Sequence, residues 1–188
     1  RFVVPILTSV VFRGPAVYSL EDGREVPVPT VVLISPTMRC NKRCVGCYAG
    51  NYTRRDDLAQ EEVESIIRQG RDLGTHMYVI LGGEPLFYEP LFDIFERFRD
   101  CAFLFFTSGH LFTQEKVDRI IKLGNVMPVV SLEGFKAETD GRRGPGSFDA
   151  VMRAFDMLRE ARALYGFSVT PTRINLDSVT SDEFFKMM

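Results

Sequence analysis

Short apolar runs alternate along this chain with longer segments in which apolar positions recur at helical spacing. The run Val31-Val32-Leu33-Ile34 is continuous and mostly β-branched, as is typical of a strand buried on both faces of a parallel sheet. Within residues 60–73 apolar side chains return every three or four positions, and Gly74 follows where a helix would end. This pattern predicts a buried strand followed by an amphipathic helix.

The same alternation continues to the end of the chain. We expect further strands at 77–81, 102–106, 126–132 and 167–170, and further helices at 91–98, 117–123 and 148–165, the last with Ser147 as its N-cap. Because the connections are short, consecutive strands are expected to be parallel and joined by right-handed βαβ units. The fold class is therefore α/β, with the sheet either open and doubly wound or curled into a full or partial barrel.

The N-terminal residues follow a different pattern. Residues 16–20 and 24–26 flank Glu21-Asp22-Gly23, a hairpin signal because glycine accepts the positive φ of such turns. We assign residues 1–29 to an N-terminal hairpin extension packed on the core and 30–188 to the main domain. The chain starts with arginine, and its last residues begin like a capped helix that stops after about two turns, so we expect a portion of a longer protein, truncated at its C-terminal side.

Composition narrows the class of protein. The 188 residues are 45% hydrophobic with a net charge of -2, which suits one globular domain and gives no electrostatic reason to bind nucleic acid or anionic lipid. No apolar run approaches the roughly 20 residues that a membrane span needs. Three of the four cysteines lie within eight positions, a spacing that favours metal binding in a reducing, cytoplasmic compartment over disulfides.

The clustered cysteines follow the first strand with the spacing Cys-x3-Cys-x2-Cys, as Cys40, Cys44 and Cys47. Active-site loops of α/β folds lie at this end of the strands. Three thiolates on one loop can hold three corners of a cubane iron-sulfur cluster, which leaves the fourth iron open to a ligand. The alternative is a zinc site completed by His76, His110 or Cys101, which would make the chain a zinc- or cluster-stabilised binding module without catalysis.

A second motif makes the comparison with a known family specific. The cysteine loop resembles the signature of the radical S-adenosylmethionine (SAM) superfamily, and Gly82-Gly83-Glu84-Pro85 after the second strand is similar to that family's Gly-Gly-Glu-Pro segment. Taken alone, this segment is better explained as an ordinary strand-to-helix turn, but it lies one βα unit after the cysteine loop. The resemblance implies that its backbone and Glu84 contact the amino group of SAM, which suits the chemistry because glycines allow close approach and a carboxylate attracts an ammonium.

The resemblance also implies the fold and further SAM contacts. The expected fold is a partial (β/α)6 TIM-like barrel, truncated after about five βα units. Thr107 and Ser108 are similar to a Thr-Asn pair that lies near the ribose and methionine parts of SAM, with Ser108 in place of Asn. Ser131 and Glu133 belong to a Ser-Leu-Glu-Gly segment that resembles the branch containing peptide-modifying members, and are expected near the ribose hydroxyls.

The last expected SAM contacts come from the second half of the barrel and from the cysteine loop. Arg143 is expected to pair with the SAM carboxylate, although a solvated basic loop would explain it as well. Thr170 and Asn175 lie where related enzymes hold the adenine edge, and a loop cap is the alternative for Asn175. The residue before the third cysteine is aromatic in many members, but here it is Gly46, so Tyr48 is expected to supply that contact.

The implied reaction is reductive cleavage of SAM at a [4Fe-4S] cluster, giving a 5'-deoxyadenosyl radical that acts on a substrate. The family resemblance implies a one-electron reductant such as flavodoxin or ferredoxin. It leaves peptide, lipid and small-molecule substrates open, and no catalytic residue beyond the cluster ligands is assigned. We expect Cys101, at the start of the third strand, to be a buried core thiol.

Overall fold

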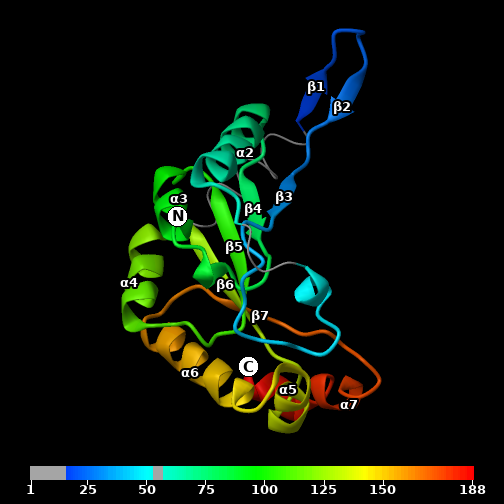
Figure 1. Ribbon diagram of the computed structural model, residues 1–188, viewed down its shortest axis with the longest axis vertical. Coiled ribbons are helices and arrows are strands. Elements are labelled where there is room, and N and C mark those ends of the chain that lie inside the picture. Colours follow the sequence, from blue (N-terminus) through cyan, green and yellow to red (C-terminus); the bar gives the residue numbers. More distant parts are fainter. Residues whose placement is uncertain (1–15, 53–56) are drawn as a thin grey trace.

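A computed structural model describes residues 16–52 and 57–188. Its centre is a five-stranded parallel sheet whose strands neighbour one another in chain order (Figure 1). The strands are β3 (Val31–Ile34), β4 (Met77–Ile80), β5 (Ala102–Thr107), β6 (Val126–Ser131) and β7 (Gly166–Ser168). Among the described residues β3 and β7 are the two edges, so the sheet is an open part of a barrel, and the α/β prediction is confirmed.

Helices connect the strands and leave the carboxyl ends of the strands to loops. They are α2 (Gln60–Leu73), α3 (Leu91–Arg97), α4 (Gln114–Leu123), α5 (Lys136–Arg143), α6 (Ser147–Glu160), α7 (Leu176–Val179) and α8 (Asp182–Met187), with 3-10 turns η2 (Tyr48–Asn51) and η3 (Pro85–Phe87). Figure 1 shows α3, α4 and α6 on one side of the sheet and the loop after β3 crossing the other. None of the described helices is long and apolar enough to cross a membrane.

The core between the sheet and α2, α3 and α4 is aromatic. Tyr78, Phe95, Phe103 and Phe105 are all fully buried, and the rings of Phe95 and Phe103 are 4.7 Å apart between centroids. Burial of each such ring stabilises the fold by about 2 to 3 kcal/mol. The phenylalanines of β5 are therefore packing residues, and Cys101 beside them is buried as expected, which raises its pKa to about 12.

The N-terminal hairpin is present but does not pack as expected. Strands β1 (Val17–Ser19) and β2 (Glu25–Pro27) pair antiparallel around Gly23, whose φ is 81°. All six strand residues are exposed, and the hairpin projects beyond the sheet (Figure 1). The expectation that it packs on the core is wrong for these strands; residues 1–15 lie outside the described residues, and the domain boundary after residue 29 stays a prediction.

Helix α6 differs from its prediction at both ends. It begins with Ser147 itself, because Gly146 holds the N-cap position with φ 76°. The Ser147 hydroxyl donates to the carbonyl of Arg143 instead of capping the helix. The helix stops at Glu160 rather than at residue 165, because Arg162 adopts a left-handed φ of 53°. The backbone N–H groups of residues 162 and 163 then close a Schellman motif on the last turn.

Candidate active site

A pocket of about 280 Å³ lies at the carboxyl ends of the strands. This volume is close to the lower end of the range for small-molecule sites. The predicted site residues that line it are Cys40, Cys44, Cys47, Tyr48, Gly82, Gly83, Glu84, Thr107, Ser108, Ser131, Arg143 and Thr170. Pro85, Glu133 and Asn175 were predicted as site residues but lie outside the lining. Loops after all five strands therefore meet at one cavity.

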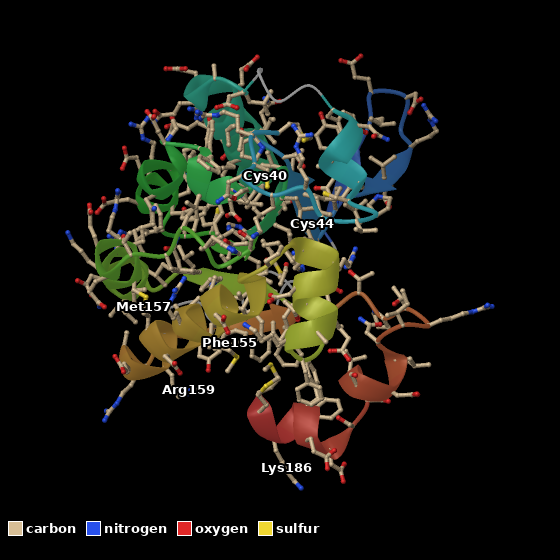
Figure 2. All side chains as sticks on the ribbon, turned by 60° about the horizontal axis from the view of Figure 1, so that its bottom comes forward. Cys40, Cys44, Phe155, Met157, Arg159 and Lys186 are labelled. Atoms are coloured by element: carbon tan, nitrogen blue, oxygen red, sulfur yellow. The ribbon has the colours of Figure 1, made fainter. Side chains whose placement is uncertain are left out.

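The three cysteines lie on a loop that starts after β3 and ends at η2; two of them are labelled in Figure 2. Cys40 and Cys44 are half-buried and Cys47 is exposed. The loop is tightly turned, because the N–H of Cys47 donates to the carbonyl of Cys44 over 3.2 Å. The N–H of Lys42 donates to Sγ of Cys40 over 3.4 Å. Three thiols and one N–H···S contact on a short loop suit an iron-sulfur cluster.

Positions 82 and 83 need glycine because another segment of the chain's own backbone lies directly against them. Their loop pairs with the residues that lead from β3 into the cysteine loop: the N–H of Gly83 donates to the carbonyl of Thr37 over 2.9 Å, and the next N–H donates to the carbonyl of Arg39 over 2.8 Å. A Cβ on Gly82 would overlap the Thr37 carbonyl oxygen, and one on Gly83 would lie 2.7 Å from the carbonyl carbon of Met38. The glycines thus let two backbones lie against each other beside the pocket.

Glu84 is buried, and its carboxylate joins the loops after β4 and β5. The Thr107 hydroxyl donates to Oε1 over 2.7 Å. The Ser108 N–H and hydroxyl donate to Oε2 over 2.8 and 2.7 Å. The N–H of Leu86 donates to Oε1 over 3.3 Å, at the start of η3, where Pro85 occupies the first position. The structure brings together the predicted residues of two separate motifs, and the serine in place of asparagine contributes two of the four donors.

Tyr48 links the cysteine loop to the glycine loop. Its hydroxyl lies 3.2 Å from both the carbonyl oxygen and the N–H of Gly82, donating to the first and accepting from the second. The side chain is also 60% exposed, so the ring still presents a face to the pocket and to solvent. This position suits the role expected of an aromatic residue beside Gly46.

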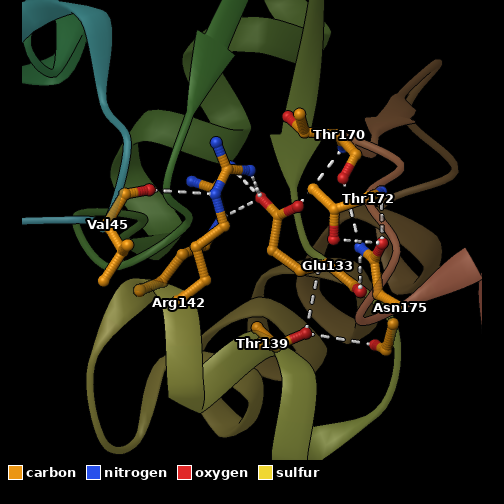
Figure 3. A network of polar contacts seen from close by, with 9 residues as sticks. Val45, Glu133, Thr139, Arg142, Thr170, Thr172 and Asn175 are labelled. Atoms are coloured by element: carbon orange, nitrogen blue, oxygen red, sulfur yellow. Dashed lines mark hydrogen bonds and ion pairs between the residues drawn. The ribbon is translucent and has the colours of Figure 1, made fainter.

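Glu133 lies behind the pocket wall in a network of charges (Figure 3). It is 1% exposed, and Arg143 contacts Oε1 with Nε at 2.8 Å and Nη2 at 2.6 Å. Nη1 of Arg142 is 2.5 Å from the same oxygen, but without the geometry of a hydrogen bond, so this contact is electrostatic. The Thr170 N–H donates to Oε2 over 3.3 Å. Glu133 therefore holds arginines rather than facing a ligand, which differs from its expected contact with ribose hydroxyls.

Asn175 holds the loop that follows β7. Its Nδ2 donates to the carbonyls of Glu133 and Thr170 over 2.8 and 3.1 Å, and Oδ1 accepts from the N–H of Thr172 over 2.6 Å (Figure 3). The residue is buried. In this structure its side chain acts as a loop cap, and it positions Thr170, which does line the pocket.

Of the three side chains considered as a fourth zinc ligand, two lie far from the cysteine loop and the third, His110, is engaged in hydrogen bonds. His76 and Cys101 precede β4 and β5, at the opposite end of the strands from the cysteine loop, where they cluster with Asp100. His110 donates from Nδ1 to the carbonyl of Ser108 over 3.2 Å, so its Nε2 accepts from Nζ of Lys42 over 2.9 Å. Burial, and then the neighbouring ammonium, lower the pKa of His110.

Two charged residues of the lining, Lys42 and Arg142, were not among the predicted site residues. Arg142 belongs to α5, a helix in which Thr139 is the buried residue. Such a polar helix has no apolar stripe, so the hydrophobic pattern gave no sign of it. The run of charged residues around two arginines was the available signal, and it indicated only that one of them could bind an anion.

The parallel α/β sheet thus brings a three-cysteine loop and a Gly-Gly-Glu-Pro loop to one pocket, an arrangement that joins metal-binding thiols to a small-molecule site. The Radical SAM superfamily model matches residues 34–184, most of the chain, and the chain belongs to this superfamily.

Relatives and solved structures agree with this assignment. An AdoMet-dependent heme synthase of Methanosarcina barkeri is 28% identical over 158 residues, 81% of this chain and 45% of that protein. Mycofactocin maturase MftC of Mycolicibacterium smegmatis is 29% identical over 187 residues, 95% of this chain and 46% of that protein. The structure of Streptococcus suis SuiB bound to S-adenosylmethionine shares the fold, with a TM-score of 0.76 and 22% identity over 86% of this chain and 38% of that one. The chain thus spans less than half the length of these relatives.

Proposed function

We propose that this chain is the catalytic core of a radical SAM enzyme that cleaves S-adenosylmethionine reductively. One observation carries the proposal: the three loop cysteines and residues 82–84 line the same pocket. A [4Fe-4S] cluster bound by Cys40, Cys44 and Cys47 would supply one electron to bound SAM, releasing methionine and a 5'-deoxyadenosyl radical. The chain's own part is to hold the cluster, orient SAM and exclude water.

The amino group of SAM is proposed to bind the loop after β4. Gly82 and Gly83 line a pocket whose wall also contains the buried residue Glu84. A carboxylate and carbonyl oxygens are the acceptors that an ammonium group needs. A carbonyl oxygen has two lone pairs, so the Gly82 carbonyl can keep the bond from Tyr48 while it accepts another.

The carboxylate of SAM is proposed to bind Arg143. Two guanidinium groups, of Arg142 and Arg143, share the single carboxylate of Glu133, which leaves one positive charge in excess at the pocket wall. Both arginine side chains are mostly buried, with 23% and 17% exposed, so the excess charge is poorly solvated and favours an anionic ligand. Ser131 and Thr170 also line the pocket. Ser131 is proposed to form a hydrogen bond with the ribose, and Thr170 is proposed to lie at the adenine edge.

Partners and location follow from this chemistry. We propose a one-electron donor such as flavodoxin or ferredoxin, and a reducing cytoplasmic compartment that preserves an iron-sulfur cluster. Relatives of this chain carry the names AdoMet-dependent heme synthase, mycofactocin maturase and probable GTP 3',8-cyclase, which point to different substrates. Peptide, lipid and small-molecule substrates are all candidates for this chain, because the residues described here surround the proposed SAM site.

The test compares Cys44→Ala with Cys101→Ala in the full-length protein, reconstituted with iron and sulfide without oxygen. Cys101 is a matched control because it is a buried thiol at the other end of the strands. We expect four irons and four sulfides per cubane in the wild type and in the control, and SAM cleavage after reduction by dithionite. The Cys44 variant should lose both cluster and cleavage. Bound zinc without sulfide in the wild type would instead support a non-catalytic binding module.

A further inference from the structure

The middle of the cysteine loop is joined to α5 by two reciprocal hydrogen bonds. The N–H of Val45 donates to the carbonyl of Arg142 over 2.8 Å. Nε of Arg142 donates to the carbonyl of Val45 over 3.1 Å. One residue thus satisfies both backbone groups of Val45, which lies 97 positions away in the chain. The Val45 side chain is 69% exposed, so side-chain burial cannot hold this part of the loop.

The other end of the Arg142 side chain reaches the charge network behind the pocket. Nη1 is 2.5 Å from Oε1 of Glu133, a residue that is itself 1% exposed and follows β6. Glu133 is fixed in turn by Arg143 and by the N–H of Thr170. Arg142 therefore connects an otherwise exposed loop to the buried carboxylate of Glu133, just after the end of β6.

The helix end itself contributes to this contact. The last four carbonyls of an α-helix have no partner within the helix. In α5 the carbonyl of Asp140 accepts from Gly144, the carbonyl of Arg142 accepts from Val45, and the carbonyl of Arg143 accepts from the Ser147 hydroxyl. The bond to the cysteine loop is thus part of how α5 ends.

The two neighbouring arginines have different contacts. The hydrogen bond and ion pair of Arg143 both go to Glu133, and its side chain lines the pocket. Arg142 divides its guanidinium between Glu133 and the loop carbonyl of Val45. Equal charge and adjacent position make Arg143 a matched control for Arg142.

We propose that Arg142 is a positioning residue for the cysteine loop, holding the segment between Cys44 and Cys47 at a fixed place relative to Glu133. The identity of the group that these cysteines bind rests on the proposed function, but the loop contact itself does not. A lysine at position 142 could keep the charge beside Glu133, but it has no Nε–H at the place that reaches Val45.

The first experiment measures backbone hydrogen exchange in the full-length protein before any cluster is loaded. We compare wild type with Arg142→Ala, Arg142→Lys and Arg143→Ala. Loss of one hydrogen bond should speed exchange in the segment around Val45 by about fivefold in both Arg142 variants, and leave it near wild type in Arg143→Ala. Wild-type exchange in Arg142→Ala, or rescue by Arg142→Lys, would overturn the positioning role. If the alanine variant does not fold, hydrogen exchange in the lysine variant alone tests the proposal.

The second experiment follows the loaded protein. After reconstitution, the Arg142 variants should hold less four-iron cluster than Arg143→Ala, and the electron paramagnetic resonance signal of the remaining reduced cluster should be broadened by a mixture of loop conformations. Signals and iron contents equal to those of wild type would contradict the proposal. Failure of the wild type to bind iron would refute the proposed function instead. The hydrogen-exchange experiment on the unloaded protein would then still test whether Arg142 restrains the loop around Val45.

Discussion

The close approach of two backbones at Gly83 leads to a strong prediction for Gly83→Ala. The new Cβ would lie 2.5 Å from the carbonyl oxygen and 2.7 Å from the carbonyl carbon of Met38, whereas ordinary contacts begin at 3.4 Å. Because the obstructing atoms are backbone rather than the end of a flexible side chain, the residues leading into the cysteine loop must move by roughly 1 Å.

The cost of this movement can be worked out from the bonds that it strains. Overpacking of a close-packed site costs about 1 to 3 kcal/mol. The bonds from the N–H groups of Gly83 and Glu84 to the carbonyls of Thr37 and Arg39 contribute about 0.5 to 1.5 kcal/mol each when intact. We therefore expect a loss of about 2 to 6 kcal/mol, a large share of the roughly 5 to 15 kcal/mol that stabilises a typical domain.

The assay is urea unfolding of the unloaded protein, with Gly141→Ala as the matched control. Gly141 lies within α5, and a Cβ there would meet no atom within 4 Å. This control should be stabilised by about 0.5 to 1 kcal/mol, because alanine is the better helix former. A loss below about 1 kcal/mol for Gly83→Ala would refute the reasoning, since it would show that the two loops separate easily.

Three further predictions concern single side chains. Glu84→Gln should cost about 1 to 3 kcal/mol in urea unfolding, because either orientation of the amide leaves the N–H of Leu86 or of Ser108 without its acceptor; unchanged stability would contradict the network. Because the pKa of His110 is lowered from 6.5 in the folded protein, the unfolded state takes up its proton first, so stability should fall as the pH drops below 6.5. His110→Gln should flatten that fall, and an equally steep decline in the variant would exclude His110 as its source. The pKa of about 12 and full burial of Cys101 predict that iodoacetamide at pH 8 labels the loop cysteines of the unloaded protein but not Cys101, a difference that mass spectrometry can measure.

Local patterns in the sequence were sufficient for most of the sheet and its helices. Helix α2 occupies the predicted residues because an apolar stripe and a terminal glycine, Gly74 with φ 109°, both mark it. The end of α6 was misjudged because the left-handed position that closes it holds Arg162 rather than glycine. No local pattern distinguishes such an arginine from one that continues the helix.

The site was predictable to the extent that its residues belong to short motifs. Gly82, Gly83 and Glu84 were predicted to meet a ligand, and the structure adds that they also meet the chain's own backbone and the loop after β5. That second role depends on contacts between residues more than 20 positions apart, which spacing in the sequence does not encode. The bond between Val45 and Arg142 was missed for the same reason, because it joins residues 97 positions apart.

The pairing of the glycine loop with the residues that lead into the cysteine loop has a consequence for how this enzyme class can diversify. Two segments interlocked through main-chain atoms must shift together or not at all, so side-chain changes in either have little freedom to reshape the cavity. New substrate preferences are therefore expected to arise outside these two paired loops.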